Sequence, residues 1–323
     1  MTPAAKKILI IRFSSIGDIV LTTPVIRCLK QELPGAEVHY LTKKQFEPIL
    51  KANPYIDRLW LYEGNFKCLI PLLRAEGYDY IADLHGNLRS AYVKLMLGKP
   101  SGSFPKLNIR KFLLVNFKWN FLPGIHIVDR YFRAVSKLGV KNDRQGLDYF
   151  ISPADEVTPA FPEYYAVVVG GKHNTKIFPP EKVAEVVEKL DKPVILLGGK
   201  EDRQRGEQVM GLTSKPMLNA CGKYSLNQAA SLVRQSSAVL TNDTGLMHIS
   251  AAYHKRMVSV WGNTIPAFGM YPYMPSNGGD SFIAEVAGLG CRPCSKIGFR
   301  ECPKHHFRCM MDISVDEIAA HIE

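Results

Sequence analysis

The chain has 323 residues, of which 46% are hydrophobic and 22% charged, and a formal net charge of +11. This composition is typical of a globular protein in water, and the length exceeds what one hydrophobic core usually organises, so we expect two domains. No apolar stretch approaches the roughly 18 residues of a membrane span, and the short apolar run 8–11 stops at Arg12, so we expect a cytosolic chain without a secretory signal peptide.

The first half of the chain alternates short apolar runs with helical patterns. Strands are predicted at 7–13, 37–41 and 78–84, and helices at 25–33 and 66–75. Thr23 is expected to cap the first of these helices, and Pro24 fits its first position. The alternation predicts an α/β domain with a mostly parallel sheet.

A turn of small and polar residues, 13–18, follows the first predicted strand. Ser15 and Gly17 let the backbone approach a ligand closely. Asp18 would stand at the carboxyl edge of the strand, where a carboxylate can take a proton from a substrate hydroxyl. Asp is also common at helix starts, and the turn alone does not separate this capping role from the catalytic one.

The region from His85 to Leu147 is strongly basic. Its twelve cations, opposed only by Asp129 and Asp143, are Arg89, Lys94, Lys99, Lys106, Arg110, Lys111, Lys118, Arg130, Arg133, Lys137, Lys141 and Arg144. The aromatic residues interleaved with them are Phe104, Phe112, Phe117, Trp119 and Phe121. This mixture indicates either a solvated surface or a face that attracts an acidic glycan, an anionic membrane surface or nucleic acid.

Prolines between residues 152 and 162 break regular structure and indicate a linker. We therefore predict two domains, 1–155 and 156–323. The second repeats the alternation of the first, with strands at 165–169, 193–197, 239–241 and 257–260, and helices at 180–190, 225–234 and 315–322. The last helix is expected in the second domain, with packing back on the first as an alternative.

A polar segment, 241–248, lies between a predicted strand and a predicted helix. In open α/β sheets such turns bind phosphates with backbone N–H groups and the helix N-terminus. Asp243, Thr244 and Gly245 form the turn, and a pyrophosphate is the expected ligand. His248, one helical turn beyond Thr244, would either donate to a phosphate or pack as a structural side chain.

Two further charged residues follow predicted strands of the second domain. Lys176 is a point charge suited to phosphate oxygens. Glu201, after the pair Gly198-Gly199, is suited to ribose hydroxyls, as acidic residues often are in nucleotide-binding folds. The alternative for Glu201 is a solvated loop charge.

Four cysteines lie near the end of the chain, at Cys291, Cys294, Cys302 and Cys309. A cytosolic location argues against disulfides, and the spacing loosely matches structural zinc sites. Nearby arginines and lysines are expected to lower the pKa values of the thiols and so favour a metal. The alternative is four reduced thiols in a compact loop.

Five segments together resemble the glycosyltransferase family of bacterial lipopolysaccharide heptosyltransferases over nearly the whole chain. They are I-R-F-S-S-I-G-D-I-V-L-T-T-P (11–24), D-L-H-G-N-L-R-S (83–90), K-I-F-P-P-E (176–181), L-L-G-G-K-E-D (196–202) and T-N-D-T-G-L-M-H-I-S-A-A (241–252). The late cysteine pattern also recurs in part of that family. The resemblance implies the α/β fold class GT-B, with two Rossmann-like domains facing each other across a cleft.

The resemblance also implies an inverting glycosyltransferase that needs no cofactor for catalysis. It implies ADP-L-glycero-D-manno-heptose as sugar donor in the second domain, and a Kdo-containing lipid A core as anionic glycolipid acceptor in the first, at the cytoplasmic face of the inner membrane. Asp18 matches the general base. The residues that match sugar-donor ligands are Lys176, Glu201, Asp243, Thr244, Gly245 and His248. The expected acceptor-binding residues are Ser15, Gly17 and Arg89.

Other functions remain open at this point. The stretch 172–175 lacks the paired threonines of some family members, which allows another nucleotide-sugar or acceptor. The GT-B fold also serves sugar-nucleotide epimerisation. A non-catalytic nucleic-acid-binding protein would use the basic region and a cysteine-bound metal, but the two lie in different halves of the chain, so we expect no nucleic-acid partner. A catalytically inactive scaffold in glycan assembly is a further alternative.

Overall fold

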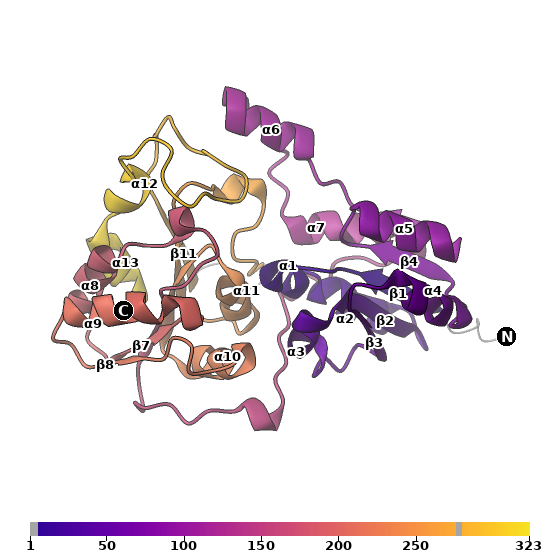
Figure 1. The fold of residues 1–323 in the computed structure, drawn as a ribbon, viewed down its shortest axis with the longest axis horizontal. Coiled ribbons are helices and arrows are strands. Elements are labelled where there is room, and N and C mark those ends of the chain that lie inside the picture. The colour runs from indigo at the N-terminus through magenta and orange to yellow at the C-terminus, as the bar shows by residue number, and fades with distance from the viewer. Residues whose placement is uncertain (1–5, 276–279) are drawn as a thin grey trace. The chain divides into compact units, whose positions relative to one another are not determined.

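The computed structural model describes residues 6–275 and 280–323. Its contacts divide the chain into two compact units (Figure 1). The first unit runs to Lys106 and resumes at Ile125–Ser152, and the second combines Leu107–Gly124 with Pro153–Glu323. The division at 152/153 lies close to the predicted boundary after residue 155, whereas the assignment of residues 107–124 to the second unit had no signal in the sequence pattern.

The first unit is built on a parallel five-stranded sheet in the order β3-β2-β1-β4-β5. Its strands are β1 (Lys7–Ile11), β2 (Glu37–Lys43), β3 (Arg58–Tyr62), β4 (Tyr80–Asp83) and β5 (Ser101–Ser103). Its α-helices are α1 (Ile16–Val20), α2 (Thr23–Glu32), α3 (Glu47–Leu50), α4 (Phe66–Ala75), α5 (Leu88–Leu97) and α7 (Ile127–Tyr131). Short 3-10 turns occupy Lys44–Phe46, Phe132–Ala134 and Ser136–Leu138.

Residues 8–11 of the central strand β1 are all apolar because both faces of the sheet are covered. Leu9 and Ile11 pack in one core cluster with Leu73 of α4 and Val93 of α5. The alternate residues of β1 are also completely buried, on the opposite face of the sheet.

The second unit has a parallel six-stranded sheet in the order β11-β10-β9-β6-β7-β8. Its strands are β6 (Tyr165–Val168), β7 (Val194–Leu197), β8 (Met217–Asn219), β9 (Ala238–Asn242), β10 (Met257–Trp261) and β11 (Ser281–Glu285). Its α-helices are α6 (Asn108–Phe117), α8 (Pro180–Lys189), α9 (Arg203–Gly211), α10 (Leu226–Gln235), α11 (Gly245–Ala252), α12 (Arg308–Met311) and α13 (Val315–Ile322). Short 3-10 turns occupy Pro153–Asp155, Asn174–Lys176, Lys200–Asp202 and Pro266–Phe268.

The last helix, α13, packs against α8 and the sheet of the second unit. Its apolar residues Val315, Ile318 and Ile322 belong to the core cluster that includes Val186 of α8 and Val258 of β10. That face of α13 is therefore occupied within the second unit. In the described part of the chain, no helix combines the length and apolarity needed to cross a bilayer.

Of the two predicted helix caps, Ser225 is confirmed and Thr23 is corrected. Ser225 caps α10 as predicted, because its side chain accepts a hydrogen bond from the Gln228 N–H at 3.2 Å. Thr23, the predicted cap of α2, is instead its first helical residue, and Thr22 holds the cap position. The Thr23 hydroxyl is used elsewhere: it accepts the Asp148 N–H at 2.9 Å.

A buried arginine ties the end of the first unit to α2. The Arg27 guanidinium donates to both oxygens of Asp143, at 2.8 and 2.9 Å, and to the Gly146 carbonyl at 2.9 Å, and it also pairs with Asp148. Only 3% of Arg27 is exposed. The two carboxylates and the carbonyl compensate for the desolvation of this charge.

We expect Arg27→Met to lower the free energy of unfolding by about 3–5 kcal/mol, because it leaves two partly buried carboxylates without their cation. Urea titration followed by circular dichroism measures the change. Arg234→Ala is the matched control, since its pair with Glu156 is exposed and should contribute less than about 1 kcal/mol. Equal costs for the two variants would contradict the structural role of Arg27.

Candidate functional site

The candidate site of the second unit lies where the strand order of its sheet reverses, between β6 and β9. The chain runs outward from β6 to β7 and β8, then returns to the other side of β6 as β9. The loops that follow β6 and β9 therefore leave the same edge of the sheet, and the chain after them continues toward opposite ends of the strand order. Such a switch point at the carboxyl ends of parallel strands is where open α/β sheets bind ligands.

The loops after β6 and β9 meet in an ion pair. The Lys176 ammonium pairs with Asp243 Oδ2, which also accepts the Thr264 hydroxyl at 2.9 Å. The side chains of Lys176 and Asp243 are 17% and 12% exposed. The lysine is thus held in place by one carboxylate, while its ammonium carries three protons and can bind further oxygens.

The start of α11 is adjacent to this pair in sequence. Thr244 holds the cap position in an extended conformation, and Gly245 is the first helical residue. Residues 243–246 are half-buried rather than covered. The free N–H groups at this helix end give it a partial positive charge. His248 lies one turn further along and is only 2% exposed, which places it on the buried side of the helix.

Asn242, the last residue of β9, holds the two loops together. Its amide donates to the carbonyls of Val168 and Gly170, at 3.1 and 3.0 Å, and accepts the Phe178 N–H at 3.0 Å. All three bonds are buried. Sequence reasoning assigned no role to Asn242, although an amide at the end of an apolar strand was a usable signal, because a buried amide requires partners.

After β7, the structure separates Glu201 from the neighbouring Asp202. Glu201 is exposed, whereas Asp202 is buried, accepts the Gly199 N–H at 2.9 Å and pairs with Arg205. A Cβ atom on Gly170 would lie 2.3 Å from Asp202 Oδ2, so only glycine permits this approach of the two loops. Asp202 is therefore structural, and Glu201 is the carboxylate available to a ligand.

The first unit repeats this geometry. Its switch point lies between β1 and β4, which pair in register from Ile8 to Ile11. Asp18 follows β1, within α1. Its Oδ2 accepts the Ser15 hydroxyl at 2.7 Å and the Ser15 N–H at 3.2 Å, and its Oδ1 pairs with Arg12 at 2.7 Å. The capping role of Asp18 is therefore real, and the side chain remains 22% exposed.

Arg12 was missed by sequence reasoning, which treated it only as the end of an apolar run. It is buried, and besides Asp18 it donates to the carbonyls of Ser14 at 2.7 Å and Leu84 at 2.5 Å. The guanidinium thus fixes the orientation of the Asp18 carboxylate relative to the loop after β4.

The loop after β4 brings a histidine to the same edge. Asp83 organises the loop by accepting the N–H groups of His85 and Gly86 at 3.0 and 2.7 Å. The His85 ring packs edge-on against Phe13 at 5.5 Å, and its buried Nδ1 has no hydrogen-bond partner among the described residues. Burial, with the cations of Arg12 and Lys106, lowers the pKa of His85 to about 4. Arg89 is exposed at the start of α5.

Cys291, Cys294 and Cys302 lie in the segment before α12, and Cys309 lies in α12, but the chemistry of these thiols differs from the expectation. Burial, and next the neighbouring Cys291, raise the pKa of Cys294 to about 11, and burial raises that of Cys309 to about 12. The predicted lowering by basic residues is thus wrong for these two thiols. The Arg292 guanidinium is occupied with the carbonyls of Trp261, Gly262, Thr264 and Val286 and the carboxylate of Glu285.

The cysteines do not form a ready-made metal site. Cys291 Sγ lies 3.8 Å from His306 Nε2, but within the described residues no three of these ligand atoms gather within 4.8 Å. The one group that meets this criterion in the described part of the chain is Glu37, His39 and Glu76. Lys7 lies 3.2 and 2.8 Å from those two carboxylates, so a cation already occupies that cluster.

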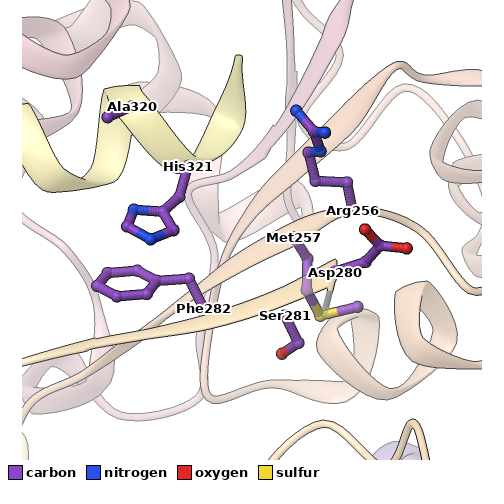
Figure 2. Close-up of a pocket in the computed structure, with 7 residues that line it drawn as sticks. All are labelled: Arg256, Met257, Asp280, Ser281, Phe282, Ala320 and His321. Carbon is purple, nitrogen blue, oxygen red and sulfur yellow. The ribbon is translucent and has the colours of Figure 1, made fainter. Parts of the chain in front are cut away.

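A shallow hollow of about 380 Å³ lies at the amino ends of β10 and β11 (Figure 2). Arg256, Asp280 and His321 line it, and the His321 ring stacks on Phe282 at 3.7 Å. Because parallel strands place their switch-point loops at the carboxyl ends, this hollow is at the wrong edge for the site formed by Lys176 and Asp243.

The comparisons with known proteins agree on one family. Residues 68–297 match Glycosyltransferase family 9 (heptosyltransferase). The chain is 24% identical to lipooligosaccharide heptosyltransferase 2 of Haemophilus ducreyi over 98% of both chains. It is 25% identical to lipopolysaccharide heptosyltransferase 1 of Campylobacter coli over 80% of this chain and 84% of that protein.

Solved structures of heptosyltransferases share the fold of this chain. The Escherichia coli ADP-heptose lipopolysaccharide heptosyltransferase II superposes with a TM-score of 0.72 at 21% identity, over 98% of this chain and 97% of that one. An Escherichia coli heptosyltransferase solved with ADP gives a TM-score of 0.71 at 20% identity, over 98% of each chain. The predicted fold class, α/β with the two Rossmann-like domains of GT-B proteins, is confirmed.

The lowered pKa of His85 predicts a pH dependence of stability. Between the ordinary histidine value of 6.5 and the folded value of about 4, the unfolded chain binds more protons than the folded one. The contribution of neutral His85 to the free energy of unfolding is therefore complete above pH 6.5, and it is lost as the pH falls toward 4. His85→Asn should lose less stability than the parent between pH 7 and 5 when thermal midpoints are compared.

The exposed His305→Asn variant is the matched control for the loss of one histidine. It should follow the pH dependence of the parent. If His85→Asn also follows the parent curve, His85 is not held neutral by the fold.

Proposed function

We propose that this chain, a member of glycosyltransferase family 9, transfers heptose from ADP-L-glycero-D-manno-heptose to the Kdo-containing core of lipid A with inversion at the anomeric carbon. Membership of the family makes the chain a glycosyltransferase, and its relatives act in lipopolysaccharide assembly. The observation that carries the proposal is the Lys176–Asp243 pair beside the start of α11, at the switch point of the second sheet.

The sugar donor would bind at the carboxyl edge of the second unit. Its pyrophosphate is the natural partner of Lys176 and the N–H groups at Gly245, because both are positive and only partly exposed. Glu201 is exposed at the neighbouring strand end and would accept the ribose hydroxyls. A heptosyltransferase of similar fold was solved with ADP, which supports ADP as the nucleotide. Buried His248 would pack on the inner side of α11 and hold that helix in place.

The reaction would be a single displacement. The acceptor oxygen attacks the anomeric carbon and gives its proton to the Asp18 carboxylate, while the bond from that carbon to the diphosphate oxygen breaks and ADP leaves. Positive charge develops on the sugar ring and negative charge on the leaving diphosphate. Lys176 and the start of α11 would stabilise that leaving group without reorganising, because Asp243 and Asn242 already hold them in place.

The acceptor would bind at the carboxyl edge of the first unit. Ser15 and Gly17 form the turn beside Asp18, and Arg89 is an exposed cation for an acidic sugar. Neutral His85, with its unpaired Nδ1, adds a hydrogen-bonding group that the sequence did not single out. An anionic glycolipid acceptor would place the chain in the cytoplasm, in peripheral contact with the inner membrane.

No cofactor is assigned to the chemistry, since Lys176 and the helix start supply the charge that the leaving group needs. A structural zinc ion at Cys291, Cys294, Cys302 and Cys309 stays a prediction. Those four sulfurs would have to move closer together to bind one ion.

Asp18→Asn should lower kcat by roughly 100- to 10,000-fold, because an amide cannot accept the acceptor's proton. The affinity for ADP should not change, since Asp18 belongs to the other unit from the proposed sugar-donor site. Steady-state kinetics with ADP-heptose and the lipid A core acceptor, together with calorimetric titration of ADP, measure both quantities. Unchanged kcat would remove Asp18 from the mechanism.

Lys176→Met should abolish most of the thermal stabilisation that ADP confers, because the pyrophosphate loses its cation. The panel is ADP, ADP-heptose, UDP and GDP, measured by thermal shift. Lys182→Met, on α8 and paired only with Glu185 among the described residues, is the matched control. Stabilisation by UDP or GDP but not ADP would keep the mechanism and change the sugar donor. No stabilisation by any of them would contradict the sugar-donor site.

A further inference from the structure

Helix α6 and the residues after it expose an unusual amount of apolar surface. Five large side chains form what we call the α6 ridge, each between 53% and 77% exposed: Ile109, Phe112, Phe117, Trp119 and Phe121. A water-soluble surface rarely gathers so many large apolar side chains in one short segment, and such patches mark interaction sites.

The ridge is an organised surface and not a set of separate side chains. The rings of Phe112 and Phe117 contact each other edge to face at 6.2 Å, and those of Phe117 and Trp119 are 5.5 Å apart. Three aromatic rings are thus in contact while more than half of each remains in solvent. Aromatic pairs of this kind usually lie in cores or interfaces.

The ridge is also fixed to the second unit. Leu114 is the buried residue of α6. At the end of the helix, the Lys118 ammonium donates to the carbonyls of Pro293 at 2.8 Å and Cys291 at 3.2 Å. The cysteine-containing loop therefore holds the ridge in position.

The surroundings of the ridge are positively charged. No Asp or Glu occurs between Asp83 and Asp129. Arg110 donates to the Phe121 carbonyl at 3.1 Å, and Lys111 lies 5.5 Å from the Phe268 ring, and neither of these two contacts is with a carboxylate. A partner that is both apolar and anionic matches this surface in both respects.

We propose that the α6 ridge docks on the surface of a bilayer that contains anionic lipids. Trp and Phe prefer the boundary between headgroups and acyl chains, and nearby Lys and Arg add attraction to anionic headgroups. The ten residues of α6 cannot span a bilayer, so the helix would lie in the plane of the surface. The inference rests on the proposed function in one respect: a glycolipid acceptor would be located in a membrane.

Co-sedimentation of the full chain with vesicles tests the proposal. Vesicles of phosphatidylcholine with phosphatidylglycerol should bind the protein, and phosphatidylcholine alone should bind it less. The double variant Phe112→Asn, Trp119→Asn should reduce partitioning by about tenfold or more, because two aromatic side chains no longer enter the interface. Arg110→Gln should mainly weaken the dependence on phosphatidylglycerol and on salt.

Leu212→Asn is the matched control, since Leu212 is 53% exposed on the same unit outside the ridge. It should partition like the parent. The double variant should keep the parent's thermal midpoint and its stabilisation by ADP, which shows that it is folded. Undiminished vesicle binding by this folded variant would overturn the proposal, and so would a parent that fails to bind either vesicle.

Two further measurements separate this proposal from others. If the ridge joins two copies of the chain, sedimentation velocity without lipid will show a dimer that the double variant loses, and the membrane proposal is then wrong. Transfer to a delipidated, soluble acceptor should be unchanged in the double variant. If vesicle binding follows the prediction while Asp18→Asn and Lys176→Met leave transfer intact, the proposed mechanism fails and the docking surface stands.

Discussion

The site of each unit depends on one constraint: parallel strands bring their carboxyl ends to the same edge, and the strand order reverses at the central strand. Two loops then diverge at that point, and the backbone groups between them need partners. In the second unit Asn242, at the end of β9, supplies partners for three backbone groups of β6 and the loop after it, and so ties the two loops together. In the first unit Arg12 does so by reaching the carbonyls of Ser14 and Leu84. Lys176, Asp243 and Asp18 take their positions from these two side chains.

Sequence reasoning found the elements whose signals are local. The segment 241–248 was recognisable because an apolar strand, a polar turn and a helix follow one another within a dozen residues. The parallel sheets and the cap at Ser225 follow from the same short-range patterns. Asp18 shows the limit of such signals, since its capping bonds to Ser15 satisfy the local pattern completely and say nothing about catalysis.

The remaining features depend on contacts between distant residues. His85 was part of a recognised motif, but its proximity to Arg12 arises from the pairing of β1 with β4. Arg292 was read as a cation beside thiols, yet it is directed at the carbonyl groups that follow β10 and β11. Burial then dominates the pKa of Cys294, which composition could not reveal. The assignment of α6 to the second unit has the same origin.

The loop that contains the cysteines connects two surfaces that sequence analysis treated separately. Lys118, at the end of α6, donates to the carbonyl of Pro293, and the adjacent Cys294 N–H donates to the Asn263 carbonyl at 3.1 Å. The next residue, Thr264, accepts Arg292 through its carbonyl and donates through its hydroxyl to Asp243. A continuous set of hydrogen bonds therefore leads from the α6 ridge to the partner of Lys176. This gives the loop a structural role that needs no metal: the same few backbone groups support both α6 and Asp243, the residue that pairs with Lys176.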